Sequence, residues 1–230
     1  METEPATTFV LIHGGGGSAW DWHLVEPELH RLGHETLAVD LPIEDPANGV
    51  AEYADAVVAA CAGLTRPVIV AHSFGGLTAP VVCSRIQAEL LVLVTAMIPA
   101  PGESPSEWWG GTGFNDLGIA IDTEQEQLDA FFNGVPRPLI EAAFAHEREQ
   151  NGGWDEPSPI RTWPDVPTRY LLCRDDRFFP PDFVRKLVAE RLGITPDEID
   201  GGHMVALQHP KALAGKLDEL WREQRTRVTG

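Results

Sequence analysis

The feature that most constrains the fold of this chain is an apolar run that ends in a serine held among small residues. Residues 67–70 (PVIV) lead into residues 71–75 (AHSFG), and GLTA follows at 76–79. This pattern predicts a buried strand that turns sharply into a helix, with Ser73 at the tip of the turn. Such a turn lifts a serine hydroxyl away from the backbone, where it can attack a carbonyl carbon. The simpler alternative is that Ser73 is a turn residue or a helix cap.

The turn departs at one position from the G-x-S-x-G pattern that is usual for a nucleophilic serine. Ala71 stands where the first glycine is expected, and an alanine is small enough to pass beneath the turn. The motif alone therefore leaves both alternatives open, and the rest of the chain has to decide between them.

Short apolar runs alternate with helical patterns along most of the chain. The runs lie at 8–13, 36–40, 68–71, 90–95, 169–173 and, more weakly, 198–200. Nearly continuous Val, Ile and Leu content is typical of strands that are buried on both faces. The helical patterns lie at 18–33, 50–64, 75–88, 181–192 and 210–224. The alternation predicts an α/β protein with a mostly parallel sheet of about six strands and helices on both faces.

The alternation breaks between residues 98 and 166, a stretch rich in Pro, Gly and Trp. Helical patterns occur within it at 123–133 and 137–150. A loop of this length without secondary structure is unusual inside a compact domain. We therefore expect an inserted helical cap at 98–166, and a core built from residues 1–97 and 167–230.

Length and charge narrow the class of protein. A chain of 230 residues fits one large domain with an insertion. Its net charge of −18 argues against nucleic acid and anionic membranes as partners, because phosphate groups are bound by basic patches. No apolar run approaches the ~20 residues that span a bilayer, and residues 1–8 lack the pattern of a secretion signal. We expect a cytoplasmic protein with a small-molecule substrate; the sequence is also compatible with a homodimer.

The cysteines indicate the same compartment. Cys61, Cys83 and Cys173 are odd in number, far apart and set in apolar stretches. They show neither a Cys-x-x-Cys pair nor a Cys/His spacing typical of a metal site. They are expected to be buried thiols in a reducing cytoplasm, with no bound metal.

Two further segments supply partners for Ser73. Acyl transfer needs a base beside the nucleophile and an acid that orients the base, and in parallel sheets such groups follow the strands. His203 follows two glycines after the last predicted strand, which makes it the predicted base; the alternative is a structural loop histidine. Asp175 and Asp176 follow the fifth predicted strand, where one would orient His203 and the other would be a solvated charge. The chain order of serine, acid and histidine matches that of the α/β-hydrolases.

Backbone N–H groups are the expected donors to the oxyanion that forms during acyl transfer. Phe74, directly after Ser73, supplies one, and the stretch 13–17 (HGGGG) after the first strand supplies the other. A glycine-rich turn can instead cradle a phosphate. However, no Gly-Lys-Ser/Thr follows, and four consecutive glycines match the G-x-G-x-x-G pattern only loosely. No nucleotide cofactor is therefore expected.

The chain resembles the α/β-hydrolases from end to end, without the first strands of the eight-stranded form. It is most similar to the compact branch that contains plant methyl-ester esterases and hydroxynitrile lyases. The matching stretches are 9–14 (FVLIHG), 17–22 (GSAWDW), 70–76 (VAHSFGG), 176–180 (DRFFP) and 202–204 (GHM). In that branch the acid precedes a proline by four residues, so the resemblance selects Asp176 over Asp175. It also assigns the second oxyanion N–H to Gly15.

These observations lead to a cofactor-independent serine hydrolase, a carboxylesterase for small or medium-sized neutral esters. Two alternatives remain open: lyase chemistry on the same three residues, and a non-catalytic small-molecule receptor. The lyases of the branch carry a threonine where Gly14 stands and a lysine where Met204 stands. Both differences count against cyanohydrin cleavage, which needs a cation near the departing cyanide. The cap matches no sequence that would identify the substrate.

Aromatic and acidic residues of the cap suggest what its pocket accepts. The expected pocket residues are Gly14, Trp108, Trp109, Phe114 and Met204, with Phe131 and Phe132 as further aromatic residues of the cap. Residues 86–136 contain eight acidic residues and neither Lys nor Arg. An apolar path beneath a negative rim would disfavour anionic substrates relative to neutral or cationic ones. The alternative is that these carboxylates face solvent without affecting the pocket.

Overall fold

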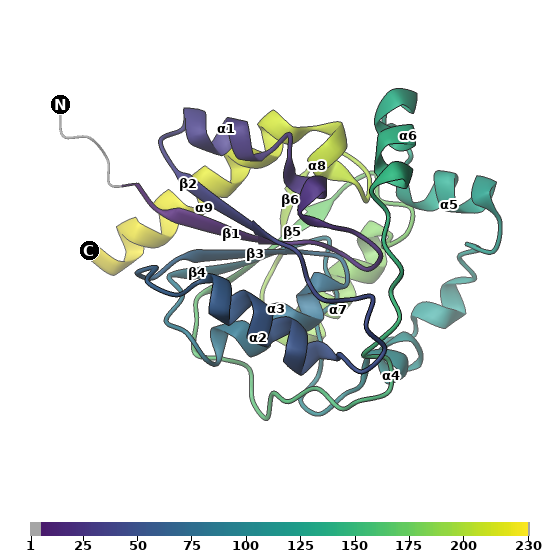
Figure 1. Ribbon diagram of the computed structural model, residues 1–230, viewed down its shortest axis with the longest axis horizontal. Coiled ribbons are helices and arrows are strands. Elements are labelled where there is room, and N and C mark those ends of the chain that lie inside the picture. Colours follow the sequence, from purple (N-terminus) through teal and green to yellow (C-terminus); the bar gives the residue numbers. More distant parts are fainter. Residues whose placement is uncertain (1–5, 230) are drawn as a thin grey trace.

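The computed structural model describes residues 6–229, and its centre is a six-stranded sheet between two layers of helices (Figure 1). The strands are β1 (Thr8–Ile12), β2 (Glu35–Val39), β3 (Val68–His72), β4 (Leu90–Val94), β5 (Thr168–Cys173) and β6 (Asp197–Ile199). Their order across the sheet is β2-β1-β3-β4-β5-β6, and every neighbouring pair is parallel. The predicted mostly parallel sheet of about six strands is confirmed, and all strands point their carboxyl ends toward one edge.

Helices cover both faces of the sheet, as the apolar runs predicted. The helices α1 (Glu26–Arg31) and α9 (Pro210–Thr229) pack on one face. The other face carries α2 (Val50–Ala60), α3 (Gly75–Cys83) and α7 (Pro181–Leu192). Along β1, Phe9 and Leu11 belong to the hydrophobic core beneath α1 and α9. Val10 and Ile12 belong to the core on the opposite face, beneath α2, α3 and α7. Alternate side chains of one strand are thus buried in two different cores, which is why the strand is apolar throughout.

The segment between β4 and β5, here called the cap (residues 98–166), combines short helices with long loops. It contains α4 (Pro105–Gly111), the 3₁₀ helix η2 (Phe114–Leu117), α5 (Glu124–Phe131) and α6 (Arg137–Ala145). In Figure 1, α5 and α6 stand beyond the carboxyl ends of the strands. After α6 the cap returns along the core, where Arg148 N–H donates to the Gly16 carbonyl (2.8 Å) and Asn151 N–H to that of Ile43 (2.9 Å). The cap therefore contacts the loops at the functional edge of the sheet.

Some helices differ from the sequence prediction. The helix expected at 18–33 is divided into the 3₁₀ helix η1 (Ala19–Trp22) and α1. Pro27 explains the break, because proline lacks an N–H and is tolerated only in the first turn of a helix. The helix expected at 137–150 ends at Ala145, since Arg148 N–H bonds to Gly16 instead of continuing the helix. The short helices α4 and α8 (Val205–Gln208) were not predicted.

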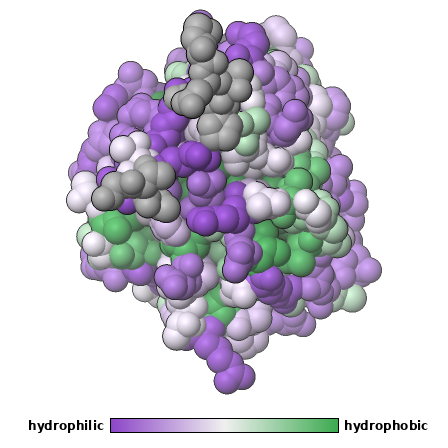
Figure 2. Space-filling view, turned by 90° about the vertical axis from the view of Figure 1, so that its left-hand side faces the viewer, coloured by the Kyte–Doolittle hydropathy of each residue, from purple (hydrophilic) through white to green (hydrophobic). Residues whose placement is uncertain are grey.

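The end of the molecule where the strands begin faces away from the cap. Figure 2 shows that this surface is largely hydrophilic, with apolar residues in separate patches. Among residues 6–229, no helix combines the length and the apolar character needed to cross a membrane.

Candidate active site

Ser73 lies at the turn between β3 and α3. Its φ angle is 50°, in the left-handed region that residues other than glycine rarely adopt. The Ser73 carbonyl accepts hydrogen bonds from the N–H groups of Gly76 (3.0 Å) and Met97 (2.9 Å), which hold the bend. Backbone strain of this kind is concentrated at functional sites, and here it holds the serine at the tip of a tight turn.

Two glycines let the turn pass close to the neighbouring strand ends. A Cβ atom on Gly75 would lie 2.5 Å from the His13 carbonyl oxygen, and one on Gly76 would collide with the Met97 carbonyl oxygen. Ala71, which replaces the usual first glycine, is fully buried in β3. Its methyl group therefore finds room in the core, and the departure from the motif leaves the turn intact.

His203 lies in the loop after β6, against the tip of the Ser73 turn. Its Nε2 is 2.9 Å from Ser73 Oγ, and its Nδ1 is 2.8 Å from Asp176 Oδ2. The imidazole is 2% exposed, and its ring centroid lies 5.1 to 5.5 Å from those of three phenylalanines, Phe131, Phe178 and Phe179. This aromatic packing restricts the ring to one orientation, in which both nitrogen atoms have partners.

Asp176 lies in the loop after β5, and four donors surround its buried carboxylate. Oδ1 accepts hydrogen bonds from the N–H groups of Phe178 and Phe179, both at 2.8 Å. Oδ2 accepts one from His203 Nδ1 and a short one from the Thr95 hydroxyl. Together these hydrogen bonds compensate for the burial of the charge and fix the direction in which the carboxylate meets His203.

Asp175 is exposed, but it is more than a solvated charge. Its Oδ2 accepts a hydrogen bond from Gly201 N–H (3.1 Å), and its own N–H donates to the Gly201 carbonyl (2.9 Å). Its carbonyl accepts a hydrogen bond from Asn133 Nδ2 of the cap (2.9 Å). Asp175 thus connects the loops of Asp176 and His203 with the cap.

The backbone N–H groups of Gly15 and Phe74 are free to bind a ligand. Among the described residues, neither N–H group has a hydrogen-bond acceptor. The two segments adjoin, because a Cβ atom on Gly15 would lie 3.4 Å from Phe74 Cβ. Two unpaired N–H groups beside a serine hydroxyl are the arrangement that binds the oxyanion of a tetrahedral intermediate.

Two neutral histidines support these loops. Burial lowers the pKa of His13 to about 4; its Nδ1–H donates to the Gly14 carbonyl (2.7 Å) and its Nε2 accepts from Leu41 N–H (3.0 Å). Burial likewise lowers the pKa of His72 to about 3, and its Nε2–H donates to the His203 carbonyl (2.9 Å). His13 thereby orients the glycine loop, and His72 connects β3 with the His203 loop.

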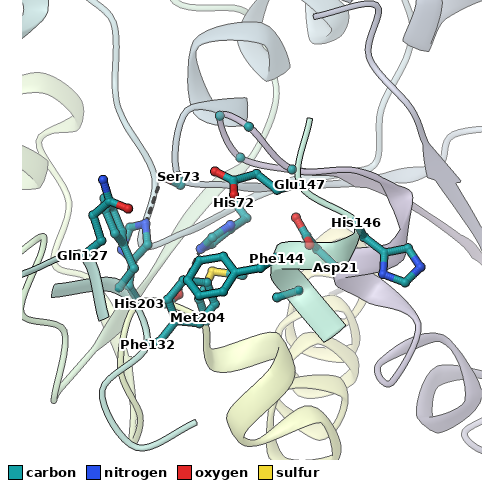
Figure 3. Close-up of a pocket in the computed structure, with 16 residues that line it drawn as sticks. Asp21, His72, Ser73, Gln127, Phe132, Phe144, His146, Glu147, His203 and Met204 are labelled. Carbon is teal, nitrogen blue, oxygen red and sulfur yellow. Dashed lines mark hydrogen bonds between the residues drawn. The ribbon is translucent and has the colours of Figure 1, made fainter. Parts of the chain in front are cut away.

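These groups open into a cavity of about 270 Å³ (Figure 3). One wall consists of the glycine loop 14–17 with His72, Ser73 and His203, and the opposite wall comes largely from α5, α6 and the residues after α6. The other lining residues are Asp21, Gln127, Phe131, Phe132, Ala143, Phe144, His146, Glu147 and Met204. Gly14 and Met204 thus lie in the pocket, as the sequence predicted.

Three predicted pocket residues, Trp108, Trp109 and Phe114, do not line this cavity. Trp108 is fully buried, and its Nε1–H donates to the Ile98 carbonyl (3.0 Å). Phe114 packs on Phe178, with ring centroids 5.2 Å apart, and Trp109 packs on Phe114. The prediction was wrong because these aromatic side chains anchor α4 and η2 to the core instead of facing the substrate.

The acidic residues of segment 86–136 do not line the cavity either. Several have local structural roles: Glu107 and Glu126 complete capping boxes with Ser104 and Thr123 at the starts of α4 and α5. Others pair with the core, as Glu103 does with Arg191. The two acidic residues that do line the cavity, Asp21 and Glu147, lie outside that segment.

Sequence reasoning also missed several residues around the site. Thr95 donates to Asp176 and has a φ angle of 37°, which is rare for a β-branched residue. Its only signal in the sequence was a polar residue at the end of an apolar strand. Asp21 was visible only as part of the GSAWDW stretch. The sequence signalled Phe131 and Phe132, at the end of α5, only as aromatic residues of the cap, and it gave no signal for Gln127 or for the contribution of α6.

The hydrogen-bonded residues can together carry out acyl transfer. The Asp176 carboxylate accepts the Nδ1–H of His203, which leaves the Nε2 lone pair directed at the Ser73 hydroxyl. In the described part of the chain, no group of three or more His, Cys, Asp or Glu residues is arranged to hold a metal ion.

Comparisons with known proteins agree with the observed fold and identify the family of the chain. A model of the alpha/beta hydrolase family matches residues 9–216. Methylesterase 3 of Arabidopsis thaliana is 31% identical over 265 residues, which cover 95% of this chain and 97% of that protein. The alpha-hydroxynitrile lyase of Arabidopsis thaliana is 25% identical over 249 residues, covering 92% and 96%.

A solved structure shows the same architecture. The crystal structure of polyneuridine aldehyde esterase matches with a TM-score of 0.79 at 21% identity, covering 94% of this chain and 99% of that one. At this identity the likeness concerns the fold alone. The family model, however, spans most of the chain, and the sequence relatives span nearly all of it. The chain therefore belongs to the α/β-hydrolase family, and its relatives include plant methylesterases and a hydroxynitrile lyase.

Proposed function

We propose that this protein is a serine hydrolase that cleaves small or medium-sized carboxylic esters without a cofactor. The observation that carries the proposal is the continuous hydrogen-bonded chain from Asp176 through His203 to Ser73, which ends in a cavity beside two unpaired N–H groups. Methylesterases among the sequence relatives support the same reaction class. The cavity of about 270 Å³ lies just below the range of about 300–1,000 Å³ usual for drug-sized ligands, which favours small or medium-sized substrates.

In the acylation step, Ser73 Oγ attacks the ester carbonyl while His203 Nε2 takes its proton. The tetrahedral oxyanion accepts hydrogen bonds from the N–H groups of Gly15 and Phe74. Asp176 stabilises the imidazolium and keeps the ring in place. His203 then gives the proton to the leaving alcohol, and the ester C–O bond breaks to form the acyl-enzyme.

In the deacylation step, water replaces the alcohol in the pocket. His203 Nε2 takes a proton from this water, which attacks the acyl carbonyl and forms a second oxyanion held by the same two N–H groups. Collapse of that intermediate returns the proton to Ser73 Oγ and releases the carboxylic acid. Apart from the ester and one water molecule, the cycle uses only side chains and backbone groups of this chain.

We predict that a fluorophosphonate probe adds once per chain, at Ser73, and that the enzyme turns over p-nitrophenyl acetate. Intact-mass measurement counts the label, peptide mapping locates it, and unfolded protein serves as the unlabelled control because activation of the serine depends on the fold. Labelling without hydrolysis of any ester in a broad panel would favour lyase chemistry. Absence of both labelling and turnover would favour a receptor.

Cyanohydrin cleavage is the second candidate, because an alpha-hydroxynitrile lyase is among the relatives. The local structure argues against it. A Cβ atom on Gly14 would lie 3.0 Å from Ser73 Cβ and 3.2 Å from His72 Nδ1, so the threonine of the lyases would be crowded here. Met204 occupies the position of their lysine, and no lysine or arginine is among the lining residues, all of which belong to the described part of the chain.

We therefore predict that the protein releases no cyanide from mandelonitrile above the uncatalysed background. A colorimetric cyanide assay at several enzyme concentrations measures this directly. The Ser73→Ala variant is the control, since it removes any contribution from the proposed nucleophile. Release that rises with enzyme concentration and disappears in this variant would contradict the prediction.

A further inference from the structure

A carboxylate lies inside the catalytic cavity, in addition to the one that orients His203. Asp21 belongs to η1, directly after the glycine loop, and its side chain lines the cavity. The carboxylate lies against the loop so closely that any side chain on Gly17 would collide with it. In Figure 3, Asp21 and His146 lie across the pocket from Ser73 and His203. A substrate bound at Ser73 therefore extends toward Asp21.

No fixed cation neutralises this carboxylate. Among the described residues, neither Asp21 nor Glu147, the other lining acid, forms an ion pair. Arg148 follows Glu147 in the chain, but its guanidinium pairs with Glu44 (2.9 Å) and Asp40 (3.7 Å) instead. The wall of the cavity thus carries negative charge that the protein itself leaves uncompensated.

The environment of Asp21 raises its proton affinity without removing the charge at alkaline pH. Burial raises the pKa of Asp21 to about 6, and the nearby Asp40 carboxylate adds to this. The N–H of Ser18 and the imidazole of His146 act in the opposite direction. At pH 8 the carboxylate is about two pH units above this pKa and is almost entirely ionised.

Aromatic side chains complete the wall around the carboxylate. Phe132 and Phe144 line the cavity and pack edge to face, with centroids 5.3 Å apart. The aromatic face of a phenylalanine attracts a cation, and a carboxylate does so over a longer range. The His146 ring stacks on Trp20 at 4.5 Å, which holds this side of the cavity in place.

We propose that Asp21 selects substrates by charge and favours esters that carry a cationic group, such as an ammonium, over neutral esters of equal size. This inference rests on the proposed ester hydrolysis and adds the substrate class to it. The cation would lie among Asp21, Phe132 and Phe144, while the ester carbonyl lies at Ser73. Anionic esters would be disfavoured for the same electrostatic reason.

The kinetic test compares a choline ester with the 3,3-dimethylbutyl ester of the same acid, which replaces the trimethylammonium group by a neutral tert-butyl group of the same shape. The ratio of kcat/KM for the cationic and neutral esters is measured at pH 8 and low ionic strength. We expect a ratio of about ten in the unmodified enzyme, which corresponds to a modest ion pair in a partly buried site. Asp21→Asn should lower this ratio about tenfold, and because it is a ratio, any general loss of activity cancels.

Two matched variants remove one negative charge elsewhere. Glu147→Gln acts at the exposed mouth of the cavity, where charges are strongly screened, and should change the ratio about twofold or less. Glu141→Gln acts on α6 outside the cavity and should leave the ratio unchanged. A ratio of one or less in the unmodified enzyme would overturn the proposal. So would an Asp21→Asn variant that folds normally and keeps the full preference, or three variants with equal effects.

A binding measurement separates this proposal from the proposed function. Isothermal titration calorimetry gives the Kd of choline and of 3,3-dimethylbutan-1-ol, the alcohols of the two esters, without any turnover. Tighter binding of choline that is lost in Asp21→Asn supports charge selection even if neither ester is hydrolysed, in which case only the esterase proposal fails. Equal binding of the two alcohols, together with hydrolysis of both esters at equal rates, would leave the esterase proposal intact and refute the role of Asp21.

Discussion

Replacing Ser73 with alanine is expected to lower kcat for ester hydrolysis by about 10³-fold or more while the protein stays folded. The change removes the oxygen that attacks the carbonyl, and no described hydroxyl other than that of Ser73 is hydrogen-bonded to His203. It also removes one hydrogen bond, which is worth about 1 kcal/mol, so the Tm should shift by only about 2–4 °C. Steady-state kinetics with p-nitrophenyl acetate and thermal unfolding followed by circular dichroism measure the two effects.

Ser84→Ala is the matched control for this experiment. Ser84 Oγ donates to the Val81 carbonyl (2.7 Å) at the end of α3, the helix that follows Ser73, so its loss also removes one hydrogen bond. This variant should show a similar shift in Tm and an unchanged kcat. A folded Ser73→Ala variant with a rate near that of the unmodified enzyme would refute the assignment of the nucleophile.

The role of His203 can be tested in the same series. His203→Ala removes the base and should reduce kcat as severely as Ser73→Ala does. Because the two residues act as one unit, the double variant should be no slower than either single variant. A double variant whose losses multiply would show that Ser73 and His203 act independently, contrary to the proposed mechanism.

The sequence predicted the sheet well because its central strands are buried on both faces. In β3 and β4 every residue is buried, so each appears as an uninterrupted apolar run with clear ends. The loops after β3, β5 and β6 carry the three polar residues of the hydrogen-bonded chain, and parallel strands bring such loops to one edge. The spatial relation of Ser73, Asp176 and His203 therefore follows from where each lies relative to a strand.

The walls of the pocket could not be predicted in the same way. Whether a cap aromatic residue faces the core or the cavity depends on how the cap helices dock, which local periodicity does not determine. Trp108 and Phe131 are both cap aromatics, yet the first anchors α4 and the second lines the cavity. The sequence analysis also expected the negative charge of the pocket to come from the acidic segment 86–136. In the structure it comes from Asp21, which lies outside the cap, and from Glu147 after α6.

Supporting groups near the site were missed for a related reason. His13 belongs to the glycine-rich stretch that the sequence analysis recognised, but its hydrogen bond to Leu41 joins loops from two different strands. Thr95 meets Asp176 across 81 positions of sequence. Contacts of this kind leave no trace in spacing or composition, since the residues involved are common at strand ends for other reasons.

Replacing Asp176 with asparagine is expected to lower kcat by about 10³-fold to 10⁴-fold. The carboxylate has two acceptor atoms for four donors, whereas an amide has one oxygen and an NH₂ group. If the oxygen keeps the N–H groups of Phe178 and Phe179, the NH₂ group faces His203 Nδ1. The imidazole must then accept at Nδ1 and carry its proton on Nε2, the tautomer that cannot take the proton of Ser73.

Asp175→Asn is the matched control, one residue away and with the same change in charge. Asp175 is exposed, and its carboxylate accepts a single hydrogen bond, from Gly201 N–H (3.1 Å), which the amide oxygen of asparagine can also accept. Its kcat should stay within about twofold of the unmodified enzyme, as is usual for surface substitutions that keep their contacts. The comparison is made at pH 8 with one ester, and circular dichroism checks that both variants are folded. A severe loss in Asp175→Asn with a mild one in Asp176→Asn would show that Asp175, and not Asp176, has the orienting role. Equal losses would show that the loop as a whole, and not the carboxylate at His203, sets the rate.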